Sequence, residues 1–98
     1  MREVFVADLA GIGREVAQAV AGADAVKEVE AKVGLDYEGG TVYRFAFPID
    51  PKPDGLEGVL LRRRVSMAVR DALMDRDDDH YPFVRLISLA DWNMHKGE

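Results

Sequence analysis

The chain has 98 residues, 48% of them hydrophobic, and its 13 Lys and Arg against 18 Asp and Glu give a net charge of −5. These values are typical of one small globular domain and exclude a wholly disordered chain. The lack of cysteine excludes disulfides, thiolate nucleophiles and cysteine-ligated metal sites. No apolar run approaches the roughly 20 residues of a membrane span, and no signal peptide is recognisable, so we expect a cytoplasmic protein.

The N-terminal third is compatible with two structures. A helical stripe of apolar residues favours a helix from about Glu3 to Ala21. Alternatively, Val4–Val6 forms a strand followed by a loop that contains Gly11 and Gly13, because a glycine inside a helix costs about 1 kcal/mol relative to alanine. These glycines also resemble the start of a dinucleotide-binding turn, but Val16 stands at the third glycine position of that fingerprint. The residues of the stripe are Phe5, Leu9, Ile12, Val16, Ala19 and Val20.

Alternating polar and apolar residues predict two strands, from Lys27 to Tyr37 and from Thr41 to Ile49. We expect a hairpin with the loop Glu38–Gly40, in which Tyr37 lies opposite Thr41. The apolar residues of both strands then share one face: Val29, Ala31, Val33, Leu35 and Tyr37 with Tyr43, Phe45, Phe47 and Ile49. The other face of the first strand is polar and carries Glu28, Glu30, Lys32 and Asp36.

A long helix is expected from Asp54 to about Asp75. The prolines at positions 48, 51 and 53 end the preceding strand, because proline cannot donate to a β-ladder. Asp54 and Glu57 have the spacing of a capping box. A broad apolar side predicts the face that packs on the sheet: Gly58, Leu61, Val65, Ala68, Val69, Ala72 and Leu73.

The C-terminal quarter contains a third predicted strand. The acidic run Asp75–Asp79 opposes the negative end of the helix dipole and is expected to end the helix. Tyr81–Leu89 then has apolar residues at both odd and even positions, which predicts a strand more buried than the first two. We expect one domain over residues 1–91 and a short C-terminal tail over residues 92–98.

The predicted order is helix, strand, strand, helix, strand, which is an α+β fold. The helical crossover makes the third strand parallel to the second. We therefore expect a three-stranded, mostly antiparallel sheet, covered on one face by both helices. The sheet gains a fourth strand if Val4–Val6 is extended.

Groups suited to catalysis or metal binding are few. A Ser-His-Asp arrangement would require Ser88 with His80 or His95. Asp77, Asp79 and His80 could hold a divalent cation, since hard cations prefer carboxylate oxygens. An EF-hand is excluded because the required glycine and glutamate are replaced by histidine and leucine. A solvated acidic turn is the favoured interpretation, and we expect no catalytic residue, cofactor or metal.

The long helix carries a second apolar stripe, which two arginines interrupt at heptad-like spacing. The stripe either packs against the first helix or contacts another chain, whether a different protein or a second copy. Methionine is frequent on adaptable binding surfaces. The stripe residues, which we predict to bind a partner, are Leu56, Leu60, Arg63, Met67, Arg70 and Met74.

The expected function is the non-catalytic binding of another protein, as in accessory, regulatory, antitoxin-like or immunity-type proteins. The main alternative is nucleic-acid binding by Arg62–Arg64 and Arg70 of the long helix, with help from Arg44 and Arg85. The net charge of −5 argues against that alternative, although a local patch can outweigh the global charge. A metal-dependent enzyme at the Asp77–His80 turn is the third alternative.

Overall fold

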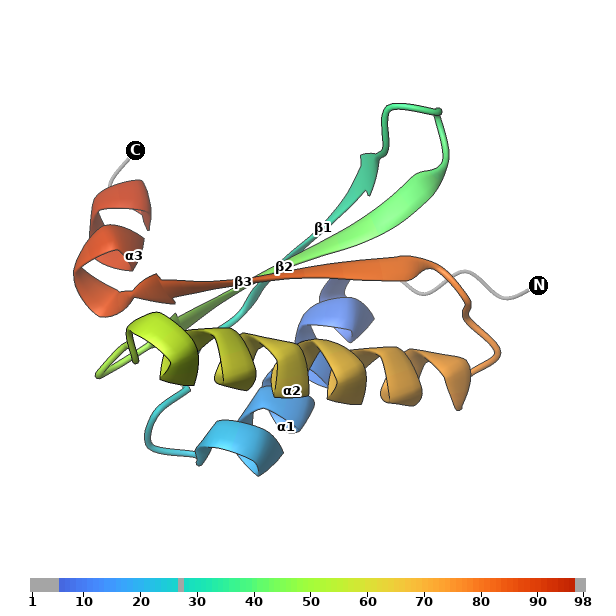
Figure 1. The fold of residues 1–98 in the computed structure, drawn as a ribbon. Coiled ribbons are helices and arrows are strands. Elements are labelled where there is room, and N and C mark those ends of the chain that lie inside the picture. The colour runs from blue at the N-terminus through green and yellow to red at the C-terminus, as the bar shows by residue number, and fades with distance from the viewer. Residues whose placement is uncertain (1–5, 27, 97–98) are drawn as a thin grey trace.

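The computed structural model describes residues 6–26 and 28–96 and confirms the α+β order (Figure 1). The strands form one sheet in the order β1-β2-β3, in which β2 pairs antiparallel with β1 and parallel with β3. The elements in chain order are α1 (Val6–Ala21), β1 (Glu30–Leu35), β2 (Thr41–Ile49), α2 (Gly55–Met74), β3 (Tyr81–Ser88) and α3 (Leu89–Lys96).

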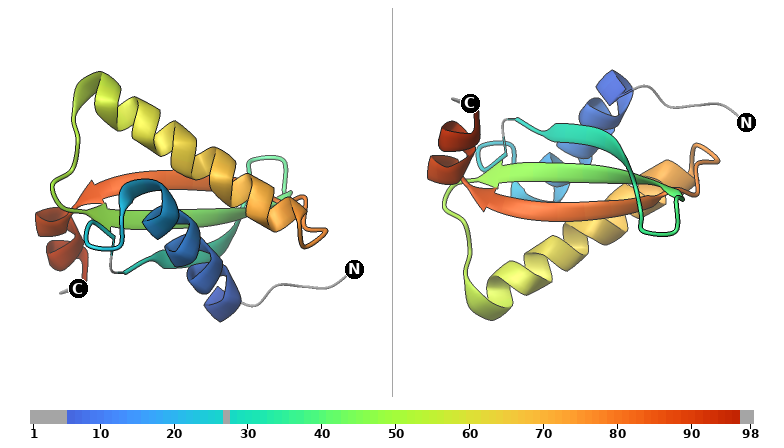
Figure 2. Two further views of the ribbon diagram at one scale, coloured as in Figure 1. Left: turned by 90° about the horizontal axis from the view of Figure 1, so that it is seen from below. Right: turned by 90° about the horizontal axis from the view of Figure 1, so that it is seen from above.

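The helices α1 and α2 lie together against one face of the sheet, as expected (Figure 2). The opposite face has no helix over it in the described part of the chain, except where α3 lies at one end of the sheet (Figure 1). The core fills the space between the helices and the inner face. Its largest fully buried side chains are Leu9, Val26, Phe45, Phe47, Val65, Val69 and Leu73.

The N-terminal third forms a helix that begins at Val6, which confirms the favoured interpretation. The remaining residues of the predicted Val4–Val6 strand lie outside the described residues. Gly13 is buried in α1, where an added Cβ would lie 2.9 Å from Cδ1 of Phe45. The glycine therefore allows α1 to approach the sheet closely and does not form a phosphate-binding turn.

The predicted register of the hairpin is wrong by two residues. Leu35 lies opposite Thr41 and Val33 opposite Tyr43, so the loop is Tyr37–Gly39 and not Glu38–Gly40. The side chain of Asp36 explains the shift, because its Oδ1 accepts hydrogen bonds from the amides of Glu38 (2.9 Å) and Gly40 (2.7 Å). A shift of two residues leaves every side chain on its predicted face.

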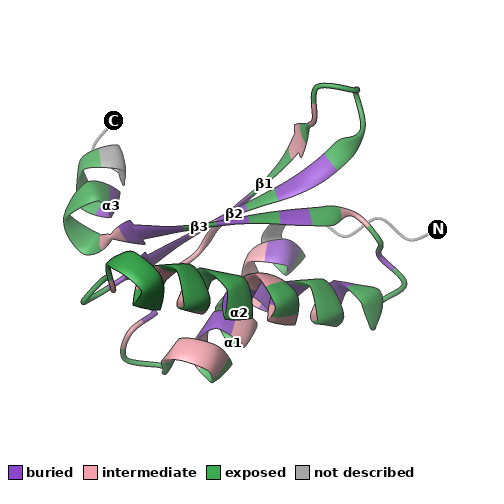
Figure 3. Cartoon of the chain, in the orientation of Figure 1, coloured by how far each residue is buried: buried purple, intermediate pink, exposed green. Residues whose placement is uncertain are grey.

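The hairpin extends beyond the helices that cover its base (Figure 3). Ala31 is buried, but Val33 and Leu35 lie on the same face and are exposed. The strand β1 is also shorter than predicted, and Lys27, where that strand was expected to begin, lies outside the described residues. The apolar alternation therefore marks a strand that the core covers at only one end.

The strand β3 is more buried than β1, as predicted, but less buried than β2, so the prediction that it exceeds both is wrong. Its exposure alternates from Tyr81 to Leu86: Val84 and Leu86 face the core, whereas Tyr81 and Phe83 are exposed on the open face. Ile87 breaks the alternation, because it has the parity of the open face but is buried. Apart from Ile87, the apolar residues of both parities thus arise from one core face and one aromatic surface. Among the three strands, β2 is the most buried, as expected for the central strand.

Two predictions about the ends of elements need correction. Asp54 precedes α2 in an extended conformation, but its side chain makes no capping hydrogen bond, so the capping box is absent. Residues 92–96, predicted to be a tail, belong to the helix α3. Trp92 is buried there, and its Nε1 donates a hydrogen bond to Oε2 of Glu28 over 2.7 Å. Packing of this ring stabilises a helix too short to form alone.

Candidate functional site

The predicted stripe lies on the side of α2 that faces away from the sheet. We define the α2 stripe as the six residues predicted to bind a partner. Its four apolar side chains are exposed by 42–72%, and both of its arginines are exposed as well. The inner side of the helix buries Val65, Val69 and Leu73 as expected. The exposed apolar members are Leu56, Leu60, Met67 and Met74.

The alternative in which the stripe packs against the first helix is wrong. The helices α1 and α2 are in contact, but α2 contributes its inner side to the shared core, including Leu61 and Ala72. A seventh residue, Val59, is also half exposed beside the stripe. The sequence contains a signal for Val59, because it lies three residues after Leu56, but the prediction omitted it.

The arginines of α2 carry uncompensated charge. All four are exposed, and within the described residues none of them forms an ion pair with a carboxylate. The helix contains only two carboxylates, Glu57 and Asp71, so it is locally positive in a chain of net charge −5. The arginines are available to a partner.

A cluster of polar groups lies at the C-terminal end of α2. The chain leaves the helix through a left-handed residue, Asp77 (φ 60°), and the amide of Asp78 donates to the carbonyl of Leu73 over 3.0 Å. This turn directs the side chain of Asp78 inward, where it is buried. The predicted solvated acidic turn thus contains one buried carboxylate.

Three donors hold the carboxylate of Asp78. The hydroxyl of Tyr43 donates to Oδ2 over 2.6 Å, and the amide of His80 donates to Oδ1 over 3.0 Å. Nδ1 of His80 lies 2.6 Å from the same Oδ1, and it carries the proton because an ionised carboxylate only accepts. The rings of Tyr43 and His80 are in contact, with centroids 4.9 Å apart. The cluster ties the α2–β3 loop to the central strand.

The hydrogen bonds set the pKa of Asp78. Burial alone raises this pKa, since it disfavours the charged form. The hydrogen bonds from Tyr43 and from the amide and ring of His80, together with the charge of His80, oppose burial. Together these interactions lower the pKa of Asp78 by more than burial raises it, so this pKa lies below its ordinary value. The carboxylate is therefore ionised at neutral pH.

Acid is expected to weaken the fold through this residue. Because the folded-state pKa of Asp78 is depressed, its ionisation stabilises the protein fully above the unfolded pKa of about 3.8. That stabilisation is lost as the pH falls through the lower folded-state pKa. In urea unfolding between pH 7 and pH 2.5, Asp78→Asn should show a shallower acid loss of stability than the wild type. Parallel pH profiles would contradict this role.

The turn is poorly suited to bind a cation. Ligand atoms of Asp78, Asp79 and His80 lie within 4.8 Å of one another. Both oxygens of Asp78 are already hydrogen bonded, however, and Nδ1 of His80 faces one of them. Binding a metal would require breaking these contacts. The predicted set of Asp77, Asp79 and His80 therefore does not form a built cation site.

The serine considered for catalysis has a structural contact. Oγ of Ser88 accepts the amide of Asp91 over 3.1 Å and so caps α3. His80 precedes the other end of β3, roughly 25 Å away at about 3.3 Å per residue. These two residues therefore cannot act as a nucleophile and its base. The side chain of His95 lies outside the described residues.

No family model, curated protein or solved structure matches this chain. Within residues 6–26 and 28–96, none of the helices has the length and apolar character that crossing a membrane requires.

Proposed function

We propose that this chain acts by binding another protein, with the α2 stripe and Val59 as the contact surface. The observation that carries the proposal is the exposed apolar row on one side of a long helix whose arginines have no ion-pair partner among the described residues. The role is proposed to be non-catalytic, of the accessory, regulatory, antitoxin-like or immunity type. The cytoplasmic location expected from the sequence stays a prediction.

The spacing of the stripe fits a partner that is itself a helix. Its residues alternate steps of four and three, which are the d and a positions of a heptad repeat. The opposite side of α2 is anchored to the core through Val65, Val69 and Leu73. A helix so anchored presents its a and d side chains at fixed positions, as a helix-in-groove or coiled-coil contact requires.

Charge argues against a second copy as the partner. In a parallel pair of α2 helices, each d-position arginine would face its own copy in the seam, Arg63 against Arg63 and Arg70 against Arg70. In an antiparallel pair, the flanking positions would bring Arg64 to Arg64 and Glu57 to Asp71 of the other copy. Both arrangements place like charges together, which opposes association.

The surface therefore fits a different protein, one that presents an amphipathic helix whose apolar side is flanked by carboxylates. The apolar side chains would bury Leu60 and Met67, and the carboxylates would pair with Arg63 and Arg70. Methionine adapts its shape to such partners. Paired arginines at the contact supply specificity and a faster encounter.

A defined probe tests this proposal. The probe is a fluorescein-labelled heptad peptide as long as α2, with leucine at a and d and glutamate at the flanking positions. We expect saturable binding in anisotropy titrations, and Met67→Glu should weaken it by about tenfold or more. The double variant Arg63→Glu/Arg70→Glu should lose this peptide and gain its lysine counterpart.

Leu35→Glu is the matched control, since it places the same charge at an equally exposed apolar residue of the hairpin. It should bind the acidic peptide as the wild type does. Equal loss in Leu35→Glu and Met67→Glu would assign the binding to general hydrophobicity. A wild-type preference for the lysine peptide would overturn the proposed partner chemistry.

A further inference from the structure

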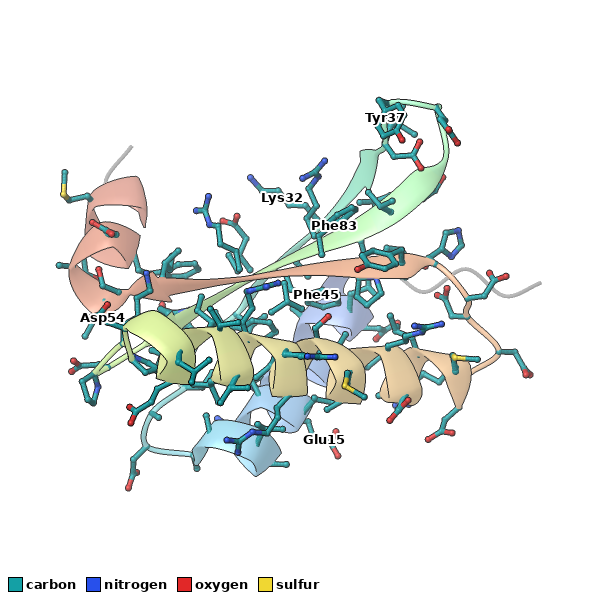
Figure 4. The ribbon with its side chains drawn as sticks, viewed as in Figure 1. Glu15, Lys32, Tyr37, Phe45, Asp54 and Phe83 are labelled. Carbon is teal, nitrogen blue, oxygen red and sulfur yellow. The ribbon has the colours of Figure 1, made fainter. Side chains whose placement is uncertain are left out.

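The open face of the sheet carries a surface that the proposed protein contact does not use. Outward-facing residues form rows across the strands, and one row runs from Lys32 on β1 through Arg44 on β2 to Phe83 on β3. Figure 4 shows Lys32 and Phe83 on this side and Phe45 on the helix side. The neighbouring row brings Tyr81 beside Phe83.

These side chains form one exposed surface, here called the platform, in which the planes of the Tyr81 and Phe83 rings are tilted by 59°. The rings of Tyr81 and Phe83 are 4.8 Å apart between centroids, and both are about half exposed. The guanidinium of Arg44 lies 5.4 Å from the centroid of Phe83. On its other side the Arg44 side chain crosses Gly34, where an added Cβ would lie 2.9 Å from Nε. Glycine at this position thus lets the arginine lie along the sheet.

Basic side chains lie on and beside the platform. Within the three strands, the outward residues include Lys32, Arg44 and Arg85 against Glu30, which pairs with Lys32 over 3.4 Å. Two further carboxylates flank β1 and are held by hydrogen bonds, Glu28 by Trp92 and Asp36 by the hairpin amides. Arg85 lies on the edge strand and also lines a pocket of about 250 Å³, whose other charged residues are Lys52, Arg62 and Asp54. The charge therefore continues past the edge of the sheet toward the start of α2.

We infer that this open face binds single-stranded nucleic acid. Exposed aromatic rings and a flat guanidinium stack on nucleobases, and basic side chains at the rim contact the phosphates. The platform requires unpaired bases, because the bases of a duplex are stacked on one another and show only their edges in the grooves. The ligand is recognised by stacking, so we expect little sequence preference.

The global charge sets the conditions for binding. A net charge of −5 opposes the approach of a polyanion, while the local patch attracts it. Phosphate contacts release counterions, so affinity should fall steeply as salt is raised. We therefore expect binding at low ionic strength in the micromolar range, about 1–100 µM.

Anisotropy titrations with fluorescein-labelled oligothymidylate and oligouridylate at low salt test the inference. The full chain should bind both saturably. Phe83→Ala and Tyr81→Ala should each weaken binding by about five- to a hundredfold, as expected for the loss of one stacked base. Phe83→Tyr keeps an aromatic ring and should retain affinity. Arg44→Ala should also reduce the slope of log affinity against log salt by about 0.7.

Met67→Ala is the control on the protein-binding surface and should leave oligonucleotide affinity unchanged. Far-ultraviolet circular dichroism of every variant checks that the exposed substitutions leave the fold intact. Three results would overturn the inference: no binding of either oligonucleotide at about 100 µM protein, equal affinity of Phe83→Ala and wild type, or equal competition by duplex DNA. Because the two surfaces share no residue, failure here leaves the protein-binding proposal standing.

Discussion

Replacing Phe45 with alanine should lower the free energy of unfolding by about 3–5 kcal/mol. Phe45 is buried at the centre of the inner face, where its ring stacks beside Phe47 with centroids 5.9 Å apart. Its ring also lies directly against Gly13 of α1. The cavity that alanine would leave is therefore bounded by the sheet on one side and by α1 on the other, and it cannot collapse easily. Domains of this size have a total stability of about 5–15 kcal/mol. Urea unfolding followed by circular dichroism measures the loss.

Phe83→Ala provides the matched control for this prediction. It removes the same ring from the neighbouring strand, but on the open face, where Phe83 is 45% exposed. The expected loss is below about 1 kcal/mol, because a half-exposed ring buries little additional area. Equal losses for the two variants would contradict the placement of the core on the helix side alone.

Asp78→Ala should cost about 3 kcal/mol of stability, the second-largest effect that we expect. The substitution removes the carboxylate that accepts hydrogen bonds from the hydroxyl of Tyr43 and from the amide of His80. Losing a charged acceptor from a buried hydrogen-bonded network is strongly unfavourable. The measurement is again the unfolding free energy at neutral pH, where the carboxylate is ionised.

The neighbouring variant Asp79→Ala separates a specific effect from a loss of charge. Asp79 is exposed, and its replacement should change stability by no more than about 0.5 kcal/mol. Tyr43→Phe should cost less than Asp78→Ala, and the double variant should show the coupling expected of one network. If Asp78→Ala behaves like Asp79→Ala, the buried cluster does not hold the loop.

Local patterns predicted most elements of the fold. The alternation over Thr41–Ile49 predicted the central strand at its observed bounds, and the three buried residues of α2, Val65, Val69 and Leu73, all belong to the predicted apolar side. Such patterns are reliable because one continuous face is buried against the core. The hairpin register depends instead on the Asp36 side chain, which competes with backbone pairing.

The missed features depend on contacts far apart in the sequence. The helix α3 is stabilised by the burial of Trp92, whose hydrogen bond reaches back to Glu28. The two-sided pattern of β3 could not distinguish a covered strand from one with an exposed aromatic face, since hydrophobicity alone does not tell which face is covered. The pattern indicated burial, and the structure shows two surfaces.

The candidate site was predicted in part. The α2 stripe was identified from its heptad spacing, and the structure adds that it is exposed and gains Val59. The role of Asp78 was missed, because four aspartates in the five positions Asp75–Asp79 indicate a solvated turn. Only the left-handed turn at Asp77 shows which carboxylate points inward. The apolar stripe alone could not predict whether α1 buries it, since that depends on where α1 packs.

Site-specific photo-crosslinking shows directly whether the α2 stripe contacts another protein. A benzophenone amino acid placed at Met67, and at Leu35 as control, probes two equally apolar exposed sites in native cells. From position 67 we expect a discrete crosslinked product with another protein. The crosslink should map to an amphipathic segment of that protein that is rich in carboxylates. The product should be lost in Arg63→Glu/Arg70→Glu. The same products from position 35, or only the dimer of this chain from position 67, would contradict the assignment of the α2 stripe to a different protein.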